Sequence, residues 1–125
     1  MAQSILIVDD DKNATELLSQ QLKNRGYEVE VVGDGYTGLE KAKKQKPDLM
    51  ILDVMLPKMD GYNVCRLLKF DHDYKNIPII MFTSLSGEEK KKISQEVGAD
   101  AYVSKPYVLE ELLTTVSDIL NRKKK

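Results

Sequence analysis

Cysteine and histidine are scarce in this sequence, with one residue of each, and tryptophan is absent. The single cysteine, Cys65, excludes an internal disulfide and is consistent with a reducing cytoplasm. It lies in a helical pattern with Val64 and Leu68, so we expect a buried thiol rather than a nucleophile. The single histidine, His72, has no second histidine or cysteine nearby, and we expect a solvated loop residue rather than a metal ligand.

Long hydrophobic runs and an excess of charge of either sign are also missing. No apolar run exceeds the length of a strand and no N-terminal signal peptide is visible, so we expect a cytoplasmic protein that does not contact a membrane. The net charge of −1 provides no electrostatic basis for direct binding of nucleic acid. The 125 residues fit a single domain, 1–125, with a core over about 3–120 and a basic end, 121–125, that frays in solvent.

Apolar residues switch repeatedly between strand-length runs and helical spacing. The pattern predicts strands at 4–8, 27–32, 49–53, 77–82 and 101–104. Helices are predicted at about 12–25, between 35 and 47, after residue 61, at 86–97 and at about 109–120. Strands alternating with helices form a βαβ series, and right-handed crossovers then give a parallel α/β sheet with helices on both faces.

The apolar spacing also predicts which side chains these elements bury. On the first helix we expect the buried face to carry Ala14, Leu17, Leu18 and Leu22. On the helix after residue 61 we expect it to carry Val64, Cys65, Leu67 and Leu68. The alternation over 27–32 places Tyr27, Val29 and Val31 on one face, which is typical of an edge strand with one wetter face.

The most informative stretch is the apolar run 49–52, which ends on Asp53. Four apolar residues in a row predict a strand that is buried on both faces. A carboxylate at the carboxyl end of a central parallel strand lies where open α/β sheets bind their ligands. Asp53 is therefore our candidate reactive group, although an acid at this position taken alone fits a helix cap or a turn equally well.

Polar groups of matched type follow four of the five predicted strands. These groups are Asp9-Asp10-Asp11, Asp53, Thr83-Ser84 and Ser104-Lys105. In a parallel sheet all four strand ends lie at one edge, and they converge on one crevice if the strand order reverses next to the first strand. The sequence therefore predicts a single polar site at this edge.

Carboxylates that lie within about 4 Å of each other repel by roughly 4 kcal/mol per pair near a protein surface. They must take up protons, pair with Lys105 or bind a cation, and a donor set of oxygens alone favours Mg²⁺, or Mn²⁺, over zinc. Such a site leaves Asp53 able to attack a phosphoryl group while Asp9 and Asp10 hold the metal. The Lys105 ammonium and the Thr83 hydroxyl would stabilise the phosphoryl oxygens.

These residues match a known family. The runs 5–10 and 47–61, together with Thr83-Ser84 and Lys105-Pro106, closely resemble the receiver domain of two-component response regulators of the chemotaxis-regulator class. The resemblance covers nearly the whole chain and implies a flavodoxin-like, doubly wound sheet of five strands in the order 2-1-3-4-5. It also implies a signalling switch rather than a turnover enzyme, one that catalyses only its own Mg²⁺-dependent phosphorylation and dephosphorylation.

The resemblance assigns roles around the acid cluster. It implies that Asp53 accepts a phosphoryl group from a histidine kinase or a histidine phosphotransfer protein. It implies that Asp10, Asp53 and the backbone carbonyl of Met55 ligate Mg²⁺ directly, whereas Asp9 acts largely through water. We add the hypothesis that apolar side chains at Met55 and Leu85 slow hydrolysis, because in the family these two positions flank the path of the attacking water.

The resemblance also assigns a switch. Lys105 would pair with the phosphoryl group, and Thr83 would move to bind the same group. In the family the peptide bond between this lysine and the following proline, here Pro106, is usually cis. Tyr102 would turn inward when Thr83 moves, although a packed strand aromatic is an alternative interpretation. A partner protein or output domain would read the change over about Glu88–Leu120, and whether phosphorylation drives dimerisation is left open.

Three other interpretations compete with this one. An EF-hand loop starting at Asp9 would need glycine and glutamate where the chain has Ala14 and Gln20, so we reject it. A haloacid-dehalogenase-type phosphatase would use Asp9 as its nucleophile, but the chain lacks the Thr or Val of that motif at Asn13 and lacks a cap domain. A degenerate receiver that serves only as a docking module is not supported, because every acid, hydroxyl and amine is present.

Overall fold

We analysed a computed structural model of the chain that describes residues 2–83, 92–93, 95–105 and 107–124. Five parallel strands form one sheet in the order β2-β1-β3-β4-β5, which confirms the expected fold class and strand order. The strands are β1 (Ser4–Val8), β2 (Glu28–Val32), β3 (Leu49–Asp53), β4 (Ile79–Thr83) and β5 (Ala101–Ser104). The helices are α1 (Lys12–Asn24), α2 (Gly35–Gln45), α3 (Gly61–Lys69) and α5 (Leu109–Lys124).

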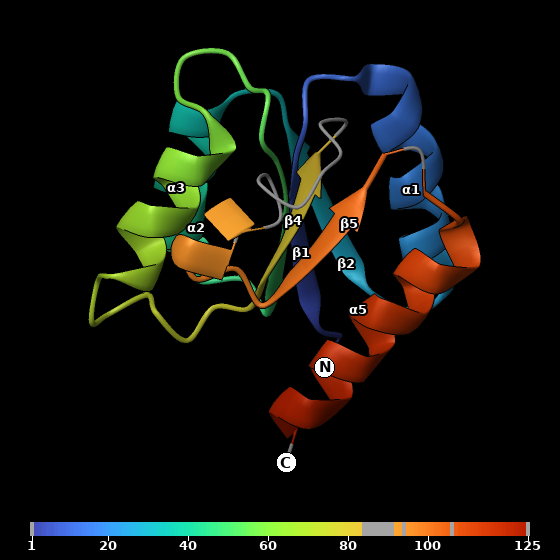
Figure 1. Cartoon of the computed structure of the whole chain (residues 1–125). Helices are drawn as coiled ribbons and strands as arrows, with labels where there is room; N and C mark the ends of the chain where they lie inside the picture. The colour runs from blue at the N-terminus through green and yellow to red at the C-terminus, as the bar shows by residue number, and fades with distance from the viewer. Residues whose placement is uncertain (1, 84–91, 94, 106, 125) are drawn as a thin grey trace.

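The sheet lies between two layers of helices, with α2 and α3 on one face and α1 and α5 on the other (Figure 1). Alternate residues of β1 and β3 supply the two apolar cores: Leu6 and Met50 point to one face, while Ile7 and Ile51 point to the other. All five residues of β3 are buried, as predicted for the central strand. The strand that carries Asp53 therefore has helices over both of its faces.

Three aspartates begin the helices that follow the first three strands. Asp11, Asp34 and Asp60 each occupy the N-cap position and accept a hydrogen bond from the backbone N–H three residues later, at distances of 3.2, 2.7 and 2.9 Å. Asp53 makes no such cap, because α3 begins at Gly61 and its N-cap is Asp60. The structure thereby removes the interpretation of Asp53 as a helix-capping acid.

Two predicted buried faces were partly wrong. Leu17 on α1 is 56% exposed and Leu67 on α3 is 48% exposed. On α1 the small polar residues Thr15 and Ser19 are buried instead, and the Thr15 hydroxyl donates a hydrogen bond to the carbonyl of Lys12 at 3.2 Å. The buried stripe of α1 is therefore rotated away from Leu17 and toward these small residues.

Several boundaries also differ from the predictions. The strands β2 and β4 begin at Glu28 and Ile79 rather than at 27 and 77. On the edge strand β2, the Val31 side chain is 38% exposed and lines a groove between β2 and α1. The basic end that we expected to fray is helical through Lys124, where cations suit a helix C-terminus. Of the helix predicted at 86–97, residues 92–93 and 95–96 are helical and most of the remainder lies outside the described residues.

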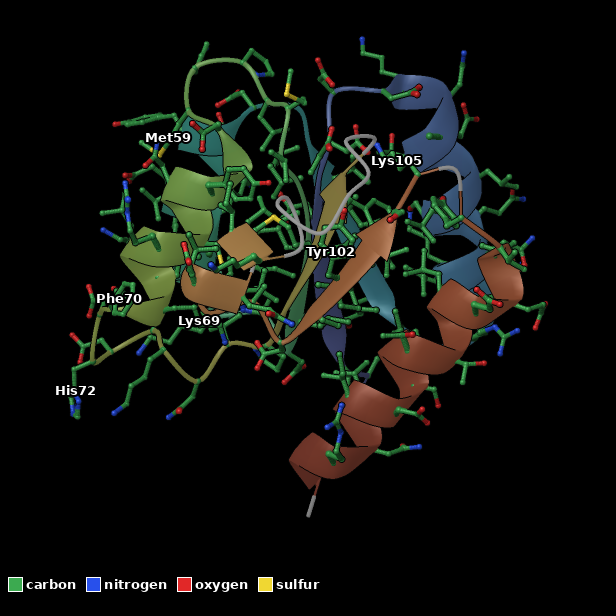
Figure 2. All side chains as sticks on the ribbon, viewed as in Figure 1. Met59, Lys69, Phe70, His72, Tyr102 and Lys105 are labelled. Carbon is green, nitrogen blue, oxygen red and sulfur yellow. The ribbon has the colours of Figure 1, made fainter. Side chains whose placement is uncertain are left out.

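The two residues that the sequence analysis set aside lie as expected. Cys65 is fully buried, and its thiol donates a hydrogen bond to the carbonyl of Val97 at 3.4 Å. His72 is exposed in the loop after α3 (Figure 2). Within the part of the chain that the structure describes, no helix has the length and apolar character needed to cross a bilayer.

Candidate functional site

Three carboxylates meet at the carboxyl edge of the sheet. Asp9 and Asp10 follow β1, Asp53 ends the neighbouring strand β3, and one oxygen from each lies within 4.8 Å of the others. Asp9 and Asp53 are only 4% and 6% exposed, whereas Asp10 faces solvent. The predicted convergence of strand ends is therefore present for these three acids.

Lys105 contributes a positive charge to the cluster from β5, two strands away from β3 in the sheet. It follows β5, an edge strand (Figure 2), and its ammonium group reaches the acids that follow β1 and end β3. Its Nζ atom lies 2.7 Å from Oδ2 of Asp9 and 3.7 Å from Oδ2 of Asp53. In this arrangement Asp9 is the closer partner of the ammonium group.

Both oxygens of Asp9 are engaged. Oδ1 accepts a hydrogen bond from the backbone N–H of Asp11 at 3.0 Å, and Oδ2 accepts one from Lys105. The backbone N–H of Asp9 itself donates to the carbonyl of Val32 at 3.0 Å. Asp9 is therefore held in place, so it is poorly arranged to act as a nucleophile.

The loop that follows Asp53 is kept tight by backbone contacts. The N–H of Val54 donates to the carbonyl of Phe82 on β4, and the N–H of Gly61 donates back to the carbonyl of Val54, both at 2.9 Å. A Cβ atom at Gly61 would lie 2.1 Å from the carbonyl oxygen of Asp53, so only glycine fits there. No pattern in the sequence indicates this steric requirement.

The electrostatics of the site follow from burial and from the excess of acids. Burial is the largest influence on Asp53 and raises its pKa, Lys105 and the backbone N–H groups of Met55 and Val54 act to lower it, and the charge of Asp9 acts to raise it, so that the pKa is about 6. Burial acts to lower the pKa of Lys105, but its hydrogen bond to Asp9 and the nearby carboxylate charges outweigh this and leave the pKa raised. The amine therefore stays protonated, while Asp53 is ionised at neutral pH at an energetic cost.

The donor set fits a hard divalent cation. The three clustered side chains offer only carboxylate oxygens, with no imidazole or thiolate among them, and this is the ligand chemistry that Mg²⁺ and Mn²⁺ prefer. Met55 lines the same pocket with a side chain that is 59% exposed. Ligation by its backbone carbonyl, and the effect of its side chain on hydrolysis, stay predictions.

The remaining predicted site residues are only partly described. Thr83 ends β4 in register with Ser104 of β5, next to the strand that carries Asp53, but its side chain is not described. Leu85 and Pro106, and with Pro106 the expected cis bond, lie outside the described residues. Tyr102 is half-buried on β5 (Figure 2). Its role as a switch stays a prediction.

Two aromatic residues of the site were missed in the sequence. The rings of Phe82 and Tyr107 are stacked with centroids 5.0 Å apart, and the Lys105 Nζ atom lies over the Phe82 ring, 5.4 Å from its centroid. The only signal was position, because one aromatic directly precedes Thr83 and the other follows Lys105 by two residues. Both positions also fit ordinary core packing, so the pattern alone did not distinguish them.

Comparison with known proteins agrees with this geometry. The sequence family described as the response regulator receiver domain matches residues 5–117. The transcriptional regulatory protein PhoP for alkaline phosphatase synthesis in Bacillus subtilis is 42% identical over 122 residues, covering 98% of this chain and 50% of that protein. The DNA-binding dual master transcriptional regulator RpaA of Synechocystis is 42% identical over 118 residues, covering 94% of this chain and 49% of RpaA. The chain thus spans about half the length of these relatives.

A solved structure also superimposes on nearly the whole chain. The CheY-like response regulator receiver domain protein from Methanospirillum hungatei matches with a TM-score of 0.91 and 31% sequence identity, covering 99% of this chain and 98% of that one. The strand order, the acid cluster and the sequence match therefore all indicate the same family.

Proposed function

This chain belongs to the receiver-domain family of two-component response regulators, and on that premise we propose that Asp53 accepts the phosphoryl group that switches the domain. One observation carries the proposal: three carboxylates and one ammonium group meet at the end of β3, around an acid that caps no helix. Of the two buried acids in this cluster, Asp53 lies farther from the ammonium group than Asp9 does. The domain is a signalling module, and its proposed chemistry is confined to its own phosphorylation and dephosphorylation.

In the proposed reaction a carboxylate oxygen of Asp53 attacks the phosphorus of a phosphohistidine. A P–O bond forms, the P–N bond breaks, and the imidazole leaves with the electron pair of the broken bond. With a pKa of about 6, Asp53 is largely ionised at neutral pH and more basic than an ordinary aspartate. Lys105, 3.7 Å from Asp53, would turn from Asp9 to the incoming phosphoryl oxygens and offset their charge.

We assign the divalent cation to Asp10, Asp53 and the backbone carbonyl of Met55, with Asp9 acting largely through water. The observed bond of Asp9 to Lys105 supports this outer role, since it leaves Asp9 less available as a direct ligand. When bound, Mg²⁺ or Mn²⁺ would offset the negative charge of the carboxylates and of the phosphoryl oxygens. Until a cation binds, Lys105 is the charge that opposes the repulsion between the acids.

The proposed partners follow from family membership. A histidine kinase or a histidine phosphotransfer protein would supply the phosphoryl group, and a partner protein or output domain would read the switch over about Glu88–Leu120. Thr83 and Tyr102 would relay the change to that surface. The relative RpaA is described as DNA-binding. For the 125 residues of this chain we propose no direct contact with nucleic acid, because their net charge is −1.

Labelling with acetyl phosphate and Mg²⁺, followed by intact-mass measurement, tests the assignment. The unmodified chain should gain one phosphoryl unit and the Asp53→Asn variant should gain none. Asp60→Asn is the matched control, because it changes another acid of the same pocket that serves only as a helix cap, and it should label normally. Full labelling of Asp53→Asn together with loss of labelling in Asp9→Asn would instead indicate a phosphatase-type nucleophile at Asp9.

A further inference from the structure

The Lys105 ammonium group has neighbours on three sides. Asp9 lies on one side at 2.7 Å, Asp53 on a second at 3.7 Å, and the face of the Phe82 ring on a third, with its centroid at 5.4 Å. The negative potential of an aromatic face attracts a cation at this distance. The ring thus covers a side of the ammonium group that would otherwise be open to water.

The Phe82 ring is itself held from two directions. Its residue pairs with Asp53 in the register of β3 and β4, and its carbonyl accepts the N–H of Val54, so its backbone is fixed relative to the proposed acceptor. Its ring stacks on Tyr107 with an interplanar angle of 27°. We define this pair, Phe82 and Tyr107, as the aromatic shelf.

The aromatic shelf matters because the Lys105 side chain must extend across a neighbouring strand to contact the acids. The residue follows the edge strand β5, and β4 lies between that strand and the acids of β3 and β1. A lysine side chain has four rotatable bonds and loses much conformational freedom when it is held in one direction. Asp9 fixes only the end of the side chain, and an aromatic face beside the ammonium narrows its choice of positions further.

We propose that Phe82 and Tyr107 are positioning residues for phosphoryl transfer, acting through Lys105 by holding its ammonium group toward Asp53. This inference rests on the function proposed above. Phe82 contacts the cation, and Tyr107 acts by orienting the Phe82 ring. Neither aromatic residue touches the reacting atoms. A leucine at either position would fill the same apolar space but would offer no aromatic face.

The test compares Phe82→Leu and Tyr107→Leu with Tyr107→Phe, which keeps the stacked ring. The readout is the rate of labelling by acetyl phosphate at saturating Mg²⁺. Loss of a cation–aromatic contact should slow labelling by about 3- to 10-fold in Phe82→Leu and by less in Tyr107→Leu. Tyr107→Phe should label at the rate of the unmodified chain. Equal rates for the unmodified chain and Phe82→Leu, or a Tyr107→Phe rate as low as that of Tyr107→Leu, would overturn the proposal.

A second comparison separates positioning from simple loss of packing. In a Lys105→Met background the shelf has no cation to hold, so adding Phe82→Leu should change the labelling rate no further. An equal fold-reduction in both backgrounds would mean that the ring acts only through packing, and the proposal would fail. If labelling of the unmodified chain does not depend on Asp53, it is the proposed function that fails instead.

A spectroscopic readout covers the case in which Phe82→Leu folds poorly. Because the Lys105 Nζ atom lies over the Phe82 ring, the NMR signals of the neighbouring ε-methylene protons should be shifted upfield in the unmodified chain. Tyr107→Leu changes a half-buried residue and should reduce this shift, whereas Tyr107→Phe should retain it. Unshifted Lys105 signals in the unmodified chain would overturn the proposal independently of any labelling rate.

Discussion

Two lysine–aspartate pairs lie at opposite edges of the same sheet. Lys105 pairs with Asp9 at the carboxyl edge at 2.7 Å, and Lys69 pairs with Asp100 at the amino edge, where β4 begins, at 2.6 Å. Figure 2 shows the two lysines at separate places, one beyond the end of β5 and one at the C-terminal end of α3. The distances are alike, but the surroundings of the two pairs differ.

The pair at the amino edge is balanced and joined to the backbone. Besides Asp100, the Lys69 ammonium donates to the carbonyl of Ile77 at 2.7 Å, and the Asp100 carboxylate accepts the N–H of Ile79 at 2.8 Å. One positive and one negative charge therefore join α3, the loop before β4 and the start of β4. This pair stabilises the fold and carries no net charge.

The pair at the carboxyl edge is unbalanced. One ammonium group faces three carboxylates, so the local sum is 1 − 3 = −2 when all are ionised. Burial of Asp53 adds to the cost of that charge, as its raised pKa shows. The same type of ion pair thus serves stability where charges balance, and binding chemistry where negative charge is in excess. The comparison predicts opposite responses to removal of a charge.

The largest effect should come from breaking the balanced pair. Lys69→Met leaves the Asp100 carboxylate and the Ile77 carbonyl without their partner, and we expect a loss of about 2–3 kcal/mol in the free energy of unfolding. Urea denaturation measures this loss. Lys44→Met removes an exposed lysine with no partner among the described residues and should change stability by less than about 0.5 kcal/mol. A loss no larger than that of the control would show that the pair contributes little.

Removal of a charge from the unbalanced site should stabilise the protein instead. The pKa of Asp53 is about 6 in the folded chain against an ordinary value of 3.8. Between these values the folded state holds a proton that the unfolded state has lost, so stability falls as the pH rises through this window. In metal-free buffer Asp53→Asn should therefore be more stable than the unmodified chain by about 1–2 kcal/mol near neutral pH.

The same comparison supplies its own pH control. As the pH falls toward the ordinary value of 3.8, the Asp53 carboxyl becomes protonated in the unfolded state as well, so the advantage of Asp53→Asn should shrink steadily toward pH 4. Thermal unfolding in the presence of a chelator, followed from pH 4 to 7.5, measures the trend. A constant difference across this range would contradict the assignment of the raised pKa to Asp53.

The smallest effect should come from adding a cation to the excess of acids. Mg²⁺ at five times its Kd should stabilise the folded chain by about 1 kcal/mol, because it binds the folded acid cluster and not the unfolded chain. Asp10→Asn should lose most of this gain. Lys69→Met should keep it in full, since that pair is remote from the cluster. An equal gain in Asp10→Asn would place the cation elsewhere.

The sequence analysis predicted the fold well because its signals are local. The fully apolar run 49–52 identified the central strand, and the alternation of strands with helices indicated a parallel sheet. The strand order came from the family resemblance and was confirmed. The errors, at Leu17 and Leu67, concern which side of a helix faces a neighbour. That depends on how closely a particular helix approaches the sheet, which apolar spacing does not encode.

The acid cluster of the candidate site was predicted, but the pairing of its groups was not. The acids Asp9, Asp10 and Asp53 do cluster, as parallel strand ends require. Nothing in the sequence indicated that Lys105 lies nearer to Asp9 than to Asp53. The need for glycine at residue 61 was also invisible, because it arises from the nearby carbonyl oxygen of Asp53, which a Cβ atom at residue 61 would meet at 2.1 Å.

By itself the amino-acid sequence determined which chemical groups follow each strand, because hydrophobic periodicity and turn residues act over a few neighbouring positions. Only the tertiary structure decided how those groups pair. Lys105 and Asp9 are 96 residues apart along the chain, and the Phe82 ring that lies beside the ammonium belongs to a third segment. Distances between such segments, and the loss of water that raises the pKa of Asp53, exist only once the sheet has formed and its two helical layers have closed over it.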